Sequence, residues 1–283
     1  MLMRDRLAVL GSPIAHSQSP ALHSAAYRVM GRPWSYDRIE MREHELTAFL
    51  NSADAAWRGL SLTMPLKKAA FAASETLDDD ARLTGVVNTL RLNDGPVAGF
   101  NTDVEGIVRA VRAAGLRAPD AVLVLGGGAT AASALVAAGR LGASHVEIAV
   151  RAPAKAQGLF PLAHEVGVEL AIRELSSSVV ASHADVIVST LPGGSEAAEQ
   201  YTADTRRHAL LFDVAYSPWP SAVARAWHDV NGSVINGLGM LVHQALLQVR
   251  VFASGSPDAV LDDEQRVLAA MLDAVHLEAD GRA

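Results

Sequence analysis

The sequence predicts an α/β protein that is built from two units. The chain has 283 residues and half of them are hydrophobic, which is enough for two separate cores. Segments with the pattern of strands alternate along it with helical segments, as they do where helices cover a sheet. After Pro119 the strand segments become continuously apolar, which is typical of a parallel sheet buried on both faces. We therefore expect an N-terminal α/β unit followed by a doubly wound parallel sheet.

The first unit is expected to contain short strands that lead into helices. Residues 7–10 are continuously apolar and predict a first buried strand. Ser19 and Pro20 predict an N-cap and a first helical position, for a helix that ends near Met30. The other expected elements are strands at 34–40, 59–63, 86–90 and 97–100, helices at 43–50, from 69 and from 103, and a hairpin turn at 93–95.

The second unit is expected to repeat a strand–helix pattern. Apolar runs of strand length predict strands at 121–125, 146–150, 186–188 and 210–214. An alanine-rich helix follows the first of these strands and stops at Gly142, and the chain is mostly helical from Leu238 onward. We therefore place one domain at residues 1–103 and 239–283, and the other at residues 104–238.

A glycine turn joins the first strand of the second unit to its helix. It matches the G-x-G-x-x-A pattern with Gly126, Gly127, Gly128, Ala129, Thr130 and Ala131. Gly126 permits the tight turn, Gly128 removes a Cβ that would block a pyrophosphate, and Ala131 keeps the helix close to the sheet. The N–H groups at the helix start favour an anion. The second unit is thus predicted to be a Rossmann-type dinucleotide-binding domain.

The residues after the next strand favour NADP over NAD. An NAD site usually has a carboxylate at that strand end, where it binds the ribose hydroxyls. Here the strand ends in Arg151, with Lys155 close behind. A guanidinium binds a 2′-phosphate that a carboxylate would repel.

Lys67 lies between a predicted strand and a predicted helix, where α/β proteins place their chemistry. By its position alone, a solvated lysine is the better interpretation. Polar residues at other strand ends change this, because they could form one pocket with a single Lys and a single Asp; they lie at 16–20, 63–67, 88–89 and 101–103. Such a pocket suits a small polyhydroxylated carboxylate. Taken separately, Ser19 and Asp103 are better explained as residues that stabilise helix starts.

Composition excludes several classes of site and partner. The formal net charge of −7 disfavours nucleic acid and anionic membranes as partners. The absence of cysteine excludes disulfides and thiolate metal sites, and the ten histidines show no metal-site spacing. No apolar stretch approaches the ~20 residues of a membrane span, and no signal peptide is evident. We expect a cytoplasmic protein without a metal, as a monomer or a homodimer.

Together these motifs resemble the shikimate dehydrogenase family from Gly11 to about Phe252. The matching segments, in order, are residues 11–20, 63–67, 87–90, 101–103, the glycine turn, 213–218 and 237–244. The resemblance implies reversible reduction of 3-dehydroshikimate to shikimate with NADPH. It also implies that Lys67 is the acid/base residue, oriented by Asp103.

The resemblance implies roles for further residues. Ser17 and Ser19 would hold the substrate carboxylate, and Tyr216 would lie near it. Gly237 and Met240 would lie near the nicotinamide. The residues around the reacting carbon would be Thr63, Lys67, Asn88, Asp103 and Gln244.

Several positions depart from the commonest family pattern. Ser61 stands where asparagine is usual, Ala129 and Thr130 replace Gly-Ala, and Ser221 with Ala222 replaces Thr-Pro. Ala152 follows Arg151 where threonine is common, so a 2′-phosphate would have fewer contacts.

Two alternatives to shikimate dehydrogenase follow from the same residues. A quinate or aminoshikimate dehydrogenase differs at one ring substituent, although Arg151 argues against the NAD-preferring quinate enzymes. A non-enzymatic dinucleotide-sensing regulator shares the fold. The Lys67–Asp103 pair argues against it, because a sensor needs no proton-transfer groups.

Overall fold

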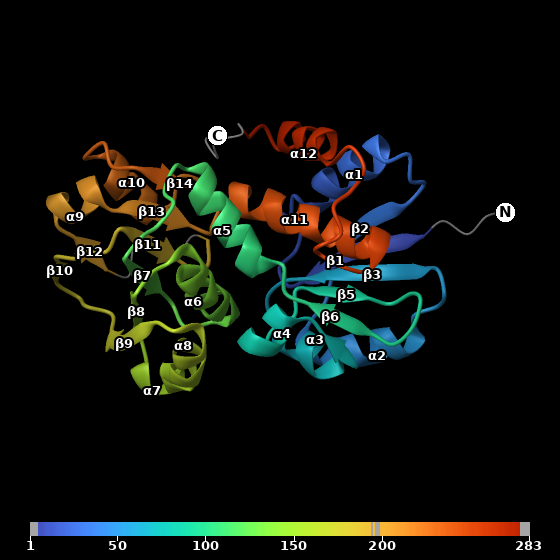
Figure 1. The fold of residues 1–283 in the computed structure, drawn as a ribbon, viewed down its shortest axis with the longest axis horizontal. Helices are drawn as coiled ribbons and strands as arrows, with labels where there is room; N and C mark the ends of the chain where they lie inside the picture. The colour runs from blue at the N-terminus through green and yellow to red at the C-terminus, as the bar shows by residue number, and fades with distance from the viewer. Residues whose placement is uncertain (1–4, 194, 196–198, 278–283) are drawn as a thin grey trace. The chain divides into compact units, whose positions relative to one another are not determined.

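The computed structural model describes residues 5–193, 195 and 199–277 and confirms the α/β fold class (Figure 1). The described chain divides into two compact units. The first holds the residues up to Asp103 and those from Leu241 onward, and the second holds Val104–Met240. None of the helices in this described part is long and apolar enough to cross a membrane.

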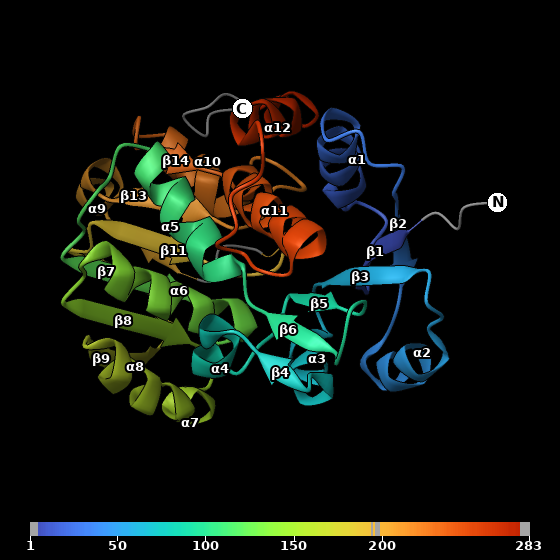
Figure 2. The same cartoon turned by 45° about the vertical axis from the view of Figure 1, so that its right-hand side comes forward.

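A six-stranded mixed sheet forms the middle of the first unit (Figure 2). Its strand order is β2-β1-β3-β5-β6-β4. β1 pairs in parallel with both β2 and β3, whereas β5 runs antiparallel to β3 and β6. The strands are β1 (Arg6–Gly11), β2 (Ser35–Glu40), β3 (Trp57–Leu62), β4 (Thr76–Leu77), β5 (Thr89–Arg91) and β6 (Ala98–Phe100).

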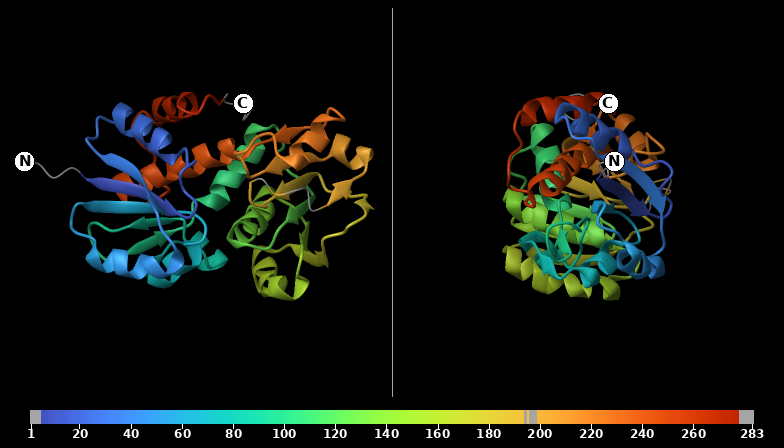
Figure 3. Two further views of the ribbon diagram at one scale, coloured as in Figure 1. Left: turned by 180° about the vertical axis from the view of Figure 1, so that it is seen from behind. Right: turned by 90° about the vertical axis from the view of Figure 1, so that its right-hand side faces the viewer.

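Helices cover both faces of this sheet, as the views from the front (Figure 1) and from behind (Figure 3) show. One face carries α2 (Leu46–Ser52), which follows the short helix η1 (Glu43–Glu45), with α3 (Lys67–Ala73) and α4 (Asp79–Thr84). The other face carries α1 (Ser19–Val29), the part of α11 (Gly237–Ser254) from Leu241 onward, and α12 (Glu264–Asp273).

The alternation along β3 decides which side chains face which layer. Leu60 and Leu62 pack with Leu66 of the turn before α3 in one buried apolar cluster. Ser61 lies between them and therefore points to the opposite face, where α11 packs. A buried polar residue thus faces α11 from the centre of the sheet.

Two predicted features of the first unit are wrong in detail. Ser19 is the first residue of α1 and Gln18 takes the N-cap position, so the Ser19 hydroxyl does not cap the helix. The strand predicted at 86–90 begins only at Thr89. The Val87 N–H leaves the strand ladder because it donates to the Lys67 carbonyl at 3.0 Å.

The second unit contains a six-stranded sheet in which every pairing is parallel. Its order is β14-β13-β11-β7-β8-β9, so the chain moves outward from β7 in one direction and then returns to build the other half beside β7. This reversal between β7 and β11 is the switch point at which such sheets bind ligands. The strands are β7 (Ala121–Leu125), β8 (His145–Val150), β9 (Glu169–Glu174), β11 (Val186–Ser189), β13 (Leu210–Asp213) and β14 (Val234–Ile235).

Helices also cover the sheet of the second unit. α6 (Ala129–Leu141) and α8 (Phe160–Val166) lie side by side, and on another face α10 (Ala222–His228) buries Trp227 against β7, β11 and β13. A separate pair of short parallel strands consists of β10 (Val179–Val180) and β12 (Gln200–Tyr201). The remaining helices are α5 (Asp103–Ala113), α7 (Pro153–Ala156), η2 (Gln157–Leu159) and α9 (Ala203–His208).

Candidate active site

The backbone fixes Lys67 on both sides. After β3 the chain makes a tight turn in which the Leu66 N–H donates to the Thr63 carbonyl at 2.8 Å. Helix α3 then begins at Lys67. The backbone carbonyl of Lys67 accepts a hydrogen bond from the Val87 N–H. The backbone of Lys67 is therefore held between the turn after β3 and the segment that leads into β5.

The Lys67 ammonium donates to the carboxylate of Asp103. Only 13% of the Lys67 side chain and 5% of the Asp103 side chain are exposed, so the ion pair is largely withdrawn from water. Asp103 is the first residue of α5, and its N–H donates to the Asn101 side-chain oxygen at 3.1 Å. The Asn101 N–H in turn donates to the Asp78 carboxylate at 3.2 Å. Removing either charge would leave the other buried without its partner.

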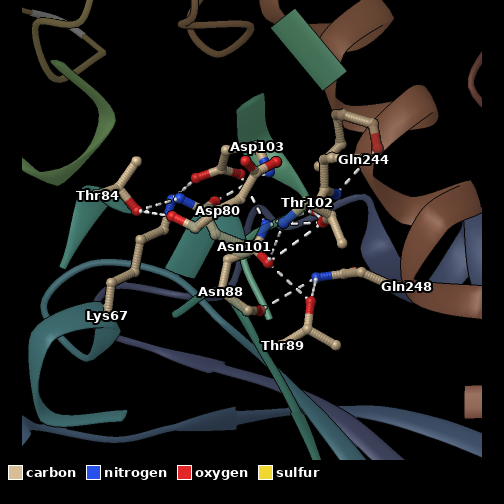
Figure 4. A network of polar contacts seen from close by, with 11 residues as sticks. Lys67, Asp80, Thr84, Asn88, Thr89, Asn101, Thr102, Asp103, Gln244 and Gln248 are labelled. Atoms are coloured by element: carbon tan, nitrogen blue, oxygen red, sulfur yellow. Dashed lines mark hydrogen bonds and ion pairs between the residues drawn. The ribbon is translucent and has the colours of Figure 1, made fainter. Parts of the chain in front are cut away.

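Asn88 lies at the centre of the polar residues around this pair (Figure 4). Its Nδ2 donates to Asp103 Oδ1 at 2.8 Å, to Thr102 Oγ1 at 2.9 Å and to Gln244 Oε1 at 3.3 Å. Its Oδ1 accepts the Thr102 N–H at 3.0 Å and the Thr89 hydroxyl at 2.7 Å. The structure thus brings together Lys67, Asp103, Asn88 and Gln244, four residues that the sequence predicted for the site.

Ser17, Ser19 and Thr63 are the other predicted substrate residues of this unit. Ser17 and Ser19 are both buried, and the Ser19 N–H donates to the Ser17 hydroxyl at 3.3 Å. Thr63 packs against Gly11, where an added Cβ would lie 2.4 Å from the Thr63 methyl group. Within the described residues, no hydrogen bond joins these three side chains to the Lys67–Asp103 pair.

This arrangement can move a proton and hold a polar ring. The Lys67 ammonium is a proton donor with restricted access to water, and the Asp103 carboxylate fixes its direction. The Asn88 and Gln244 amides supply neutral donors and acceptors beside it, which suit the hydroxyl groups of a ligand.

The glycine turn after β7 has the geometry that a dinucleotide requires. Gly126 has φ of +105°, which favours glycine, and a Cβ there would lie 2.5 Å from the Thr190 hydroxyl. A Cβ on Gly128 would meet no atom within 4 Å, so the space in front of that residue is open to a ligand. Gly128 is the N-cap of α6 and no side chain caps the helix there. The N–H groups of Ala129 and Thr130 therefore stand at an uncapped helix start, which suits a pyrophosphate.

The other residues predicted for the cofactor also lie in the second unit. Arg151 and Lys155 follow β8 and are both exposed, as a 2′-phosphate site needs. Gly127 is exposed in the turn, and Met240 is buried near the start of α11. Gly237 packs so closely that a Cβ would lie 1.9 Å from a backbone carbonyl oxygen, that of Val214. Tyr216, which was predicted for the substrate and not for the cofactor, is half-buried in the loop after β13.

Sequence reasoning missed Gln248, which contacts Asn88 and Thr89 from α11. A signal was present, because Gln248 follows Gln244 by about one turn of a largely apolar helix, which puts both on one face. The structure also explains one departure from the family pattern: the Ser221 hydroxyl caps α10 by accepting the Ala224 N–H at 3.1 Å. Serine thus supplies the capping oxygen that threonine would supply.

No group of three or more acidic, histidine or cysteine side chains that could hold a metal ion occurs in the described part of the chain.

Comparisons with known proteins identify the family of this chain. Residues 9–90 match the model of the shikimate dehydrogenase substrate binding domain. An NADP(+)-type shikimate dehydrogenase from Methylobacterium radiotolerans is 32% identical over 274 residues, which cover 93% of this chain and 96% of the relative. One from Methanothermobacter thermautotrophicus is 30% identical over 92% of this chain and 95% of the relative.

Solved structures give the same result. The shikimate dehydrogenase of Mycobacterium tuberculosis superposes with a TM-score of 0.79 at 34% identity, covering 95% of this chain and 99% of that one. A shikimate 5-dehydrogenase from Thermus thermophilus, solved with NADP(H) and shikimate, gives a TM-score of 0.77 at 31% identity with the same coverage. The chain belongs to the shikimate dehydrogenase family.

Proposed function

We propose that this chain catalyses the reversible, NADPH-dependent reduction of 3-dehydroshikimate to shikimate. The observation that carries the proposal is the withdrawn Lys67–Asp103 ion pair beside the Asn88 and Gln244 amides. The relatives that align with nearly the full chain are named shikimate dehydrogenase (NADP(+)). A structural relative was solved with both NADP(H) and shikimate.

The proposed chemistry transfers one hydride and one proton. A bound NADPH would supply the hydride for the ketone carbon from its reduced nicotinamide. The carbonyl π electrons move to the ketone oxygen, and the Lys67 ammonium gives that oxygen a proton to complete the alcohol. In the reverse direction, the neutral Lys67 amine takes the proton from the alcohol. The Asp103 carboxylate holds the Lys67 side chain in position. It also accepts a hydrogen bond from a substrate hydroxyl.

The remaining residues have binding roles in this proposal. Thr63, Asn88 and Gln244 hold the ring hydroxyls, and Ser17 with Ser19 holds the substrate carboxylate. Tyr216 lies near the carboxylate end of the substrate. Buried or half-buried hydroxyl groups suit these tasks because they bind oxygens without adding charge.

NADP is the proposed cofactor, held by the second unit. The open, uncapped glycine turn receives the pyrophosphate, and exposed Arg151 and Lys155 bind the 2′-phosphate. Gly237 and Met240 border the nicotinamide. In this scheme residues 1–103 and 239–283 form the substrate domain, and residues 104–238 form the NADP domain.

The cellular setting is also a proposal. A net charge of −7 and the absence of cysteine fit a cytoplasmic enzyme that acts on a small molecule, without a nucleic-acid or membrane partner. We propose a monomer or a homodimer, which sedimentation of the purified chain distinguishes.

A substrate panel tests the proposed reaction. We expect kcat/KM to be highest for shikimate with NADP, well above that for quinate or aminoshikimate and above that for shikimate with NAD. A higher kcat/KM for quinate would assign the alternative substrate. Dinucleotide binding without turnover of any of these acids would support the regulator instead.

A further inference from the structure

Gln248, a second glutamine of α11, contacts Asn88, which in turn contacts Asp103 (Figure 4). It is buried, with 2% of the residue exposed. One end of its amide faces the Asn88 carbonyl at 3.1 Å and the Thr89 hydroxyl at 3.0 Å. The other end faces the Ser61 hydroxyl at 2.8 Å and His23 Nε2 at 3.3 Å. Both ends of the amide are therefore engaged by protein groups.

The Asn88 carbonyl fixes the orientation of this amide. A backbone carbonyl oxygen only accepts hydrogen bonds, so the end of Gln248 that faces it must be the NH₂ group. The oxygen Oε1 must then face Ser61 and His23, and both of these must donate. One obligatory acceptor thus sets the direction of the surrounding bonds.

The partners on the Oε1 side are consistent with this direction. The Ser61 hydroxyl donates to Gln248 and accepts from the Tyr36 hydroxyl at 2.7 Å. Burial lowers the pKa of His23 to about 3, although the bond to Gln248 opposes the shift, so the ring is neutral and has one proton to give. With that proton on Nε2, Nδ1 accepts from the Tyr27 hydroxyl at 3.0 Å.

On the NH₂ side of Gln248, the hydrogen bonds also run in one direction, toward the Lys67–Asp103 pair. Thr89 accepts from Gln248, so its own proton goes to Asn88 Oδ1 at 2.7 Å. The Thr102 N–H, an obligatory donor, also points to that oxygen. The Asn88 amide therefore turns its NH₂ group to Asp103 Oδ1 at 2.8 Å, while Lys67 donates to the other carboxylate oxygen.

We propose that Gln248 is a positioning residue for the reaction. It touches neither the reacting atoms nor Asp103, and it acts by fixing the Asn88 amide and the backbone around it. The Asn88 amide then fixes the Asp103 carboxylate that directs Lys67. This inference rests on the proposed roles of Lys67 and Asp103.

The first test removes the amide and keeps its volume. Gln248→Met should lower kcat about tenfold, because the Asn88 backbone carbonyl and the Thr89 hydroxyl lose their donor and hold the Asn88 side chain less firmly. The KM for shikimate should change less, since the substrate-facing groups all remain. The matched control is Arg250→Met, which removes another buried polar side chain from α11; Arg250 donates to Glu264 and to the Pro257 carbonyl instead. The control should lower the melting temperature and leave kcat near the parent value.

The second test makes the role of Gln248 depend on protonation. In Gln248→Glu, an ionised carboxylate would face the Asn88 carbonyl and repel it, whereas the neutral acid donates to that carbonyl as the amide does. Burial favours the neutral acid and raises the pKa of such a carboxyl group. The kcat of Gln248→Glu relative to the parent should therefore rise as the pH falls, while the same ratio for Gln248→Met stays flat.

The outcomes separate this inference from the proposed function. If Lys67→Ala abolishes turnover but Gln248→Met behaves like Arg250→Met, only the role of Gln248 is wrong. A flat pH ratio for Gln248→Glu would also overturn it. If Lys67→Ala keeps its turnover, the proposed mechanism fails and the role of Gln248 fails with it.

Discussion

Replacing Lys67 with alanine is the most direct test of the proposed proton transfer. General acid catalysis contributes about 10²–10⁴-fold to a rate, or roughly 3–5 kcal/mol of barrier. Only 13% of the Lys67 side chain is exposed, so bulk water is a poor substitute for the missing ammonium. We therefore expect kcat of Lys67→Ala to fall by about 10²-fold or more. The KM for shikimate should change by less than about tenfold, because Asn88 and Gln244 remain in place.

Lys68 provides a matched control one residue away. It is exposed in the same first turn of α3, so Lys68→Ala removes the same charge from the same helix. Its kcat should equal that of the parent within about twofold, since exposed substitutions are usually close to neutral. The assay follows NADPH absorbance in both directions, with a melting curve for each variant to confirm that it is folded.

Two further measurements separate a lost proton donor from a damaged site. A small primary amine added to Lys67→Ala should restore part of kcat, because it can occupy the space of the side chain and supply the proton. Deuterated NADPH should show a larger isotope effect in forward kcat if the chemical step has become slower. A kcat within about threefold of the parent would refute the acid/base role.

Further predictions concern the cofactor and the stability of each unit. Arg151→Ala should weaken NADP binding about 10- to 100-fold and spare NAD, and equal losses in a titration of both would refute the assignment. Gly128→Ala should lower NADPH affinity without changing the melting temperature, since a Cβ there meets no protein atom. Gly237→Ala should instead cost about 3 kcal/mol or more of unfolding free energy, because its Cβ would lie 1.9 Å from the Val214 carbonyl oxygen; a normal urea curve would contradict this. Burial raises the pKa of Asp78 from 3.8 to about 6. Below pH 3.8 the carboxyl group is protonated in both the folded and the unfolded state, so its burial does not lower the free energy of unfolding. That free energy falls as the pH rises from 3.8 through about 6, because the buried group must then ionise. Asp78→Asn should remove this decline from unfolding curves measured across that range, and an unchanged decline would contradict it.

The sequence predicted the parallel strands of the second unit well, and the reason is physical. β7, β11 and β13 are buried on both faces, so each is a continuous apolar run. β9 was missed because it lies at the edge of the sheet and contains charged residues, among them Arg173. Helix α4 was missed because it has six residues, too few to show an apolar period.

The site was predictable where its residues stand at strand ends and helix starts. Lys67 and Asp103 were recognised in this way and form an ion pair in the structure. The contact of Gln248 with Asn88 could not be predicted, because it joins residues 160 positions apart in the chain. Ser19 was misassigned for the same reason, since a hydroxyl next to a proline resembles a cap until the partners from other elements are known.

The one-way order of the hydrogen bonds around Gln248 restricts where the proton of each turnover can come from. Every hydrogen bond on the path from Tyr36 to Asp103 has its donor on the Tyr36 side. A proton passed along this path would reverse the direction of each bond, and the bonds would have to turn back before a second proton could follow. Its distant end is a tyrosine whose pKa burial raises well above the usual range. This path is therefore a poor route for the repeated supply of protons to Asp103. Of the two side chains in the ion pair, Lys67 has the larger exposed fraction, 13% against 5%, so we expect it to recover its proton from solvent at that surface.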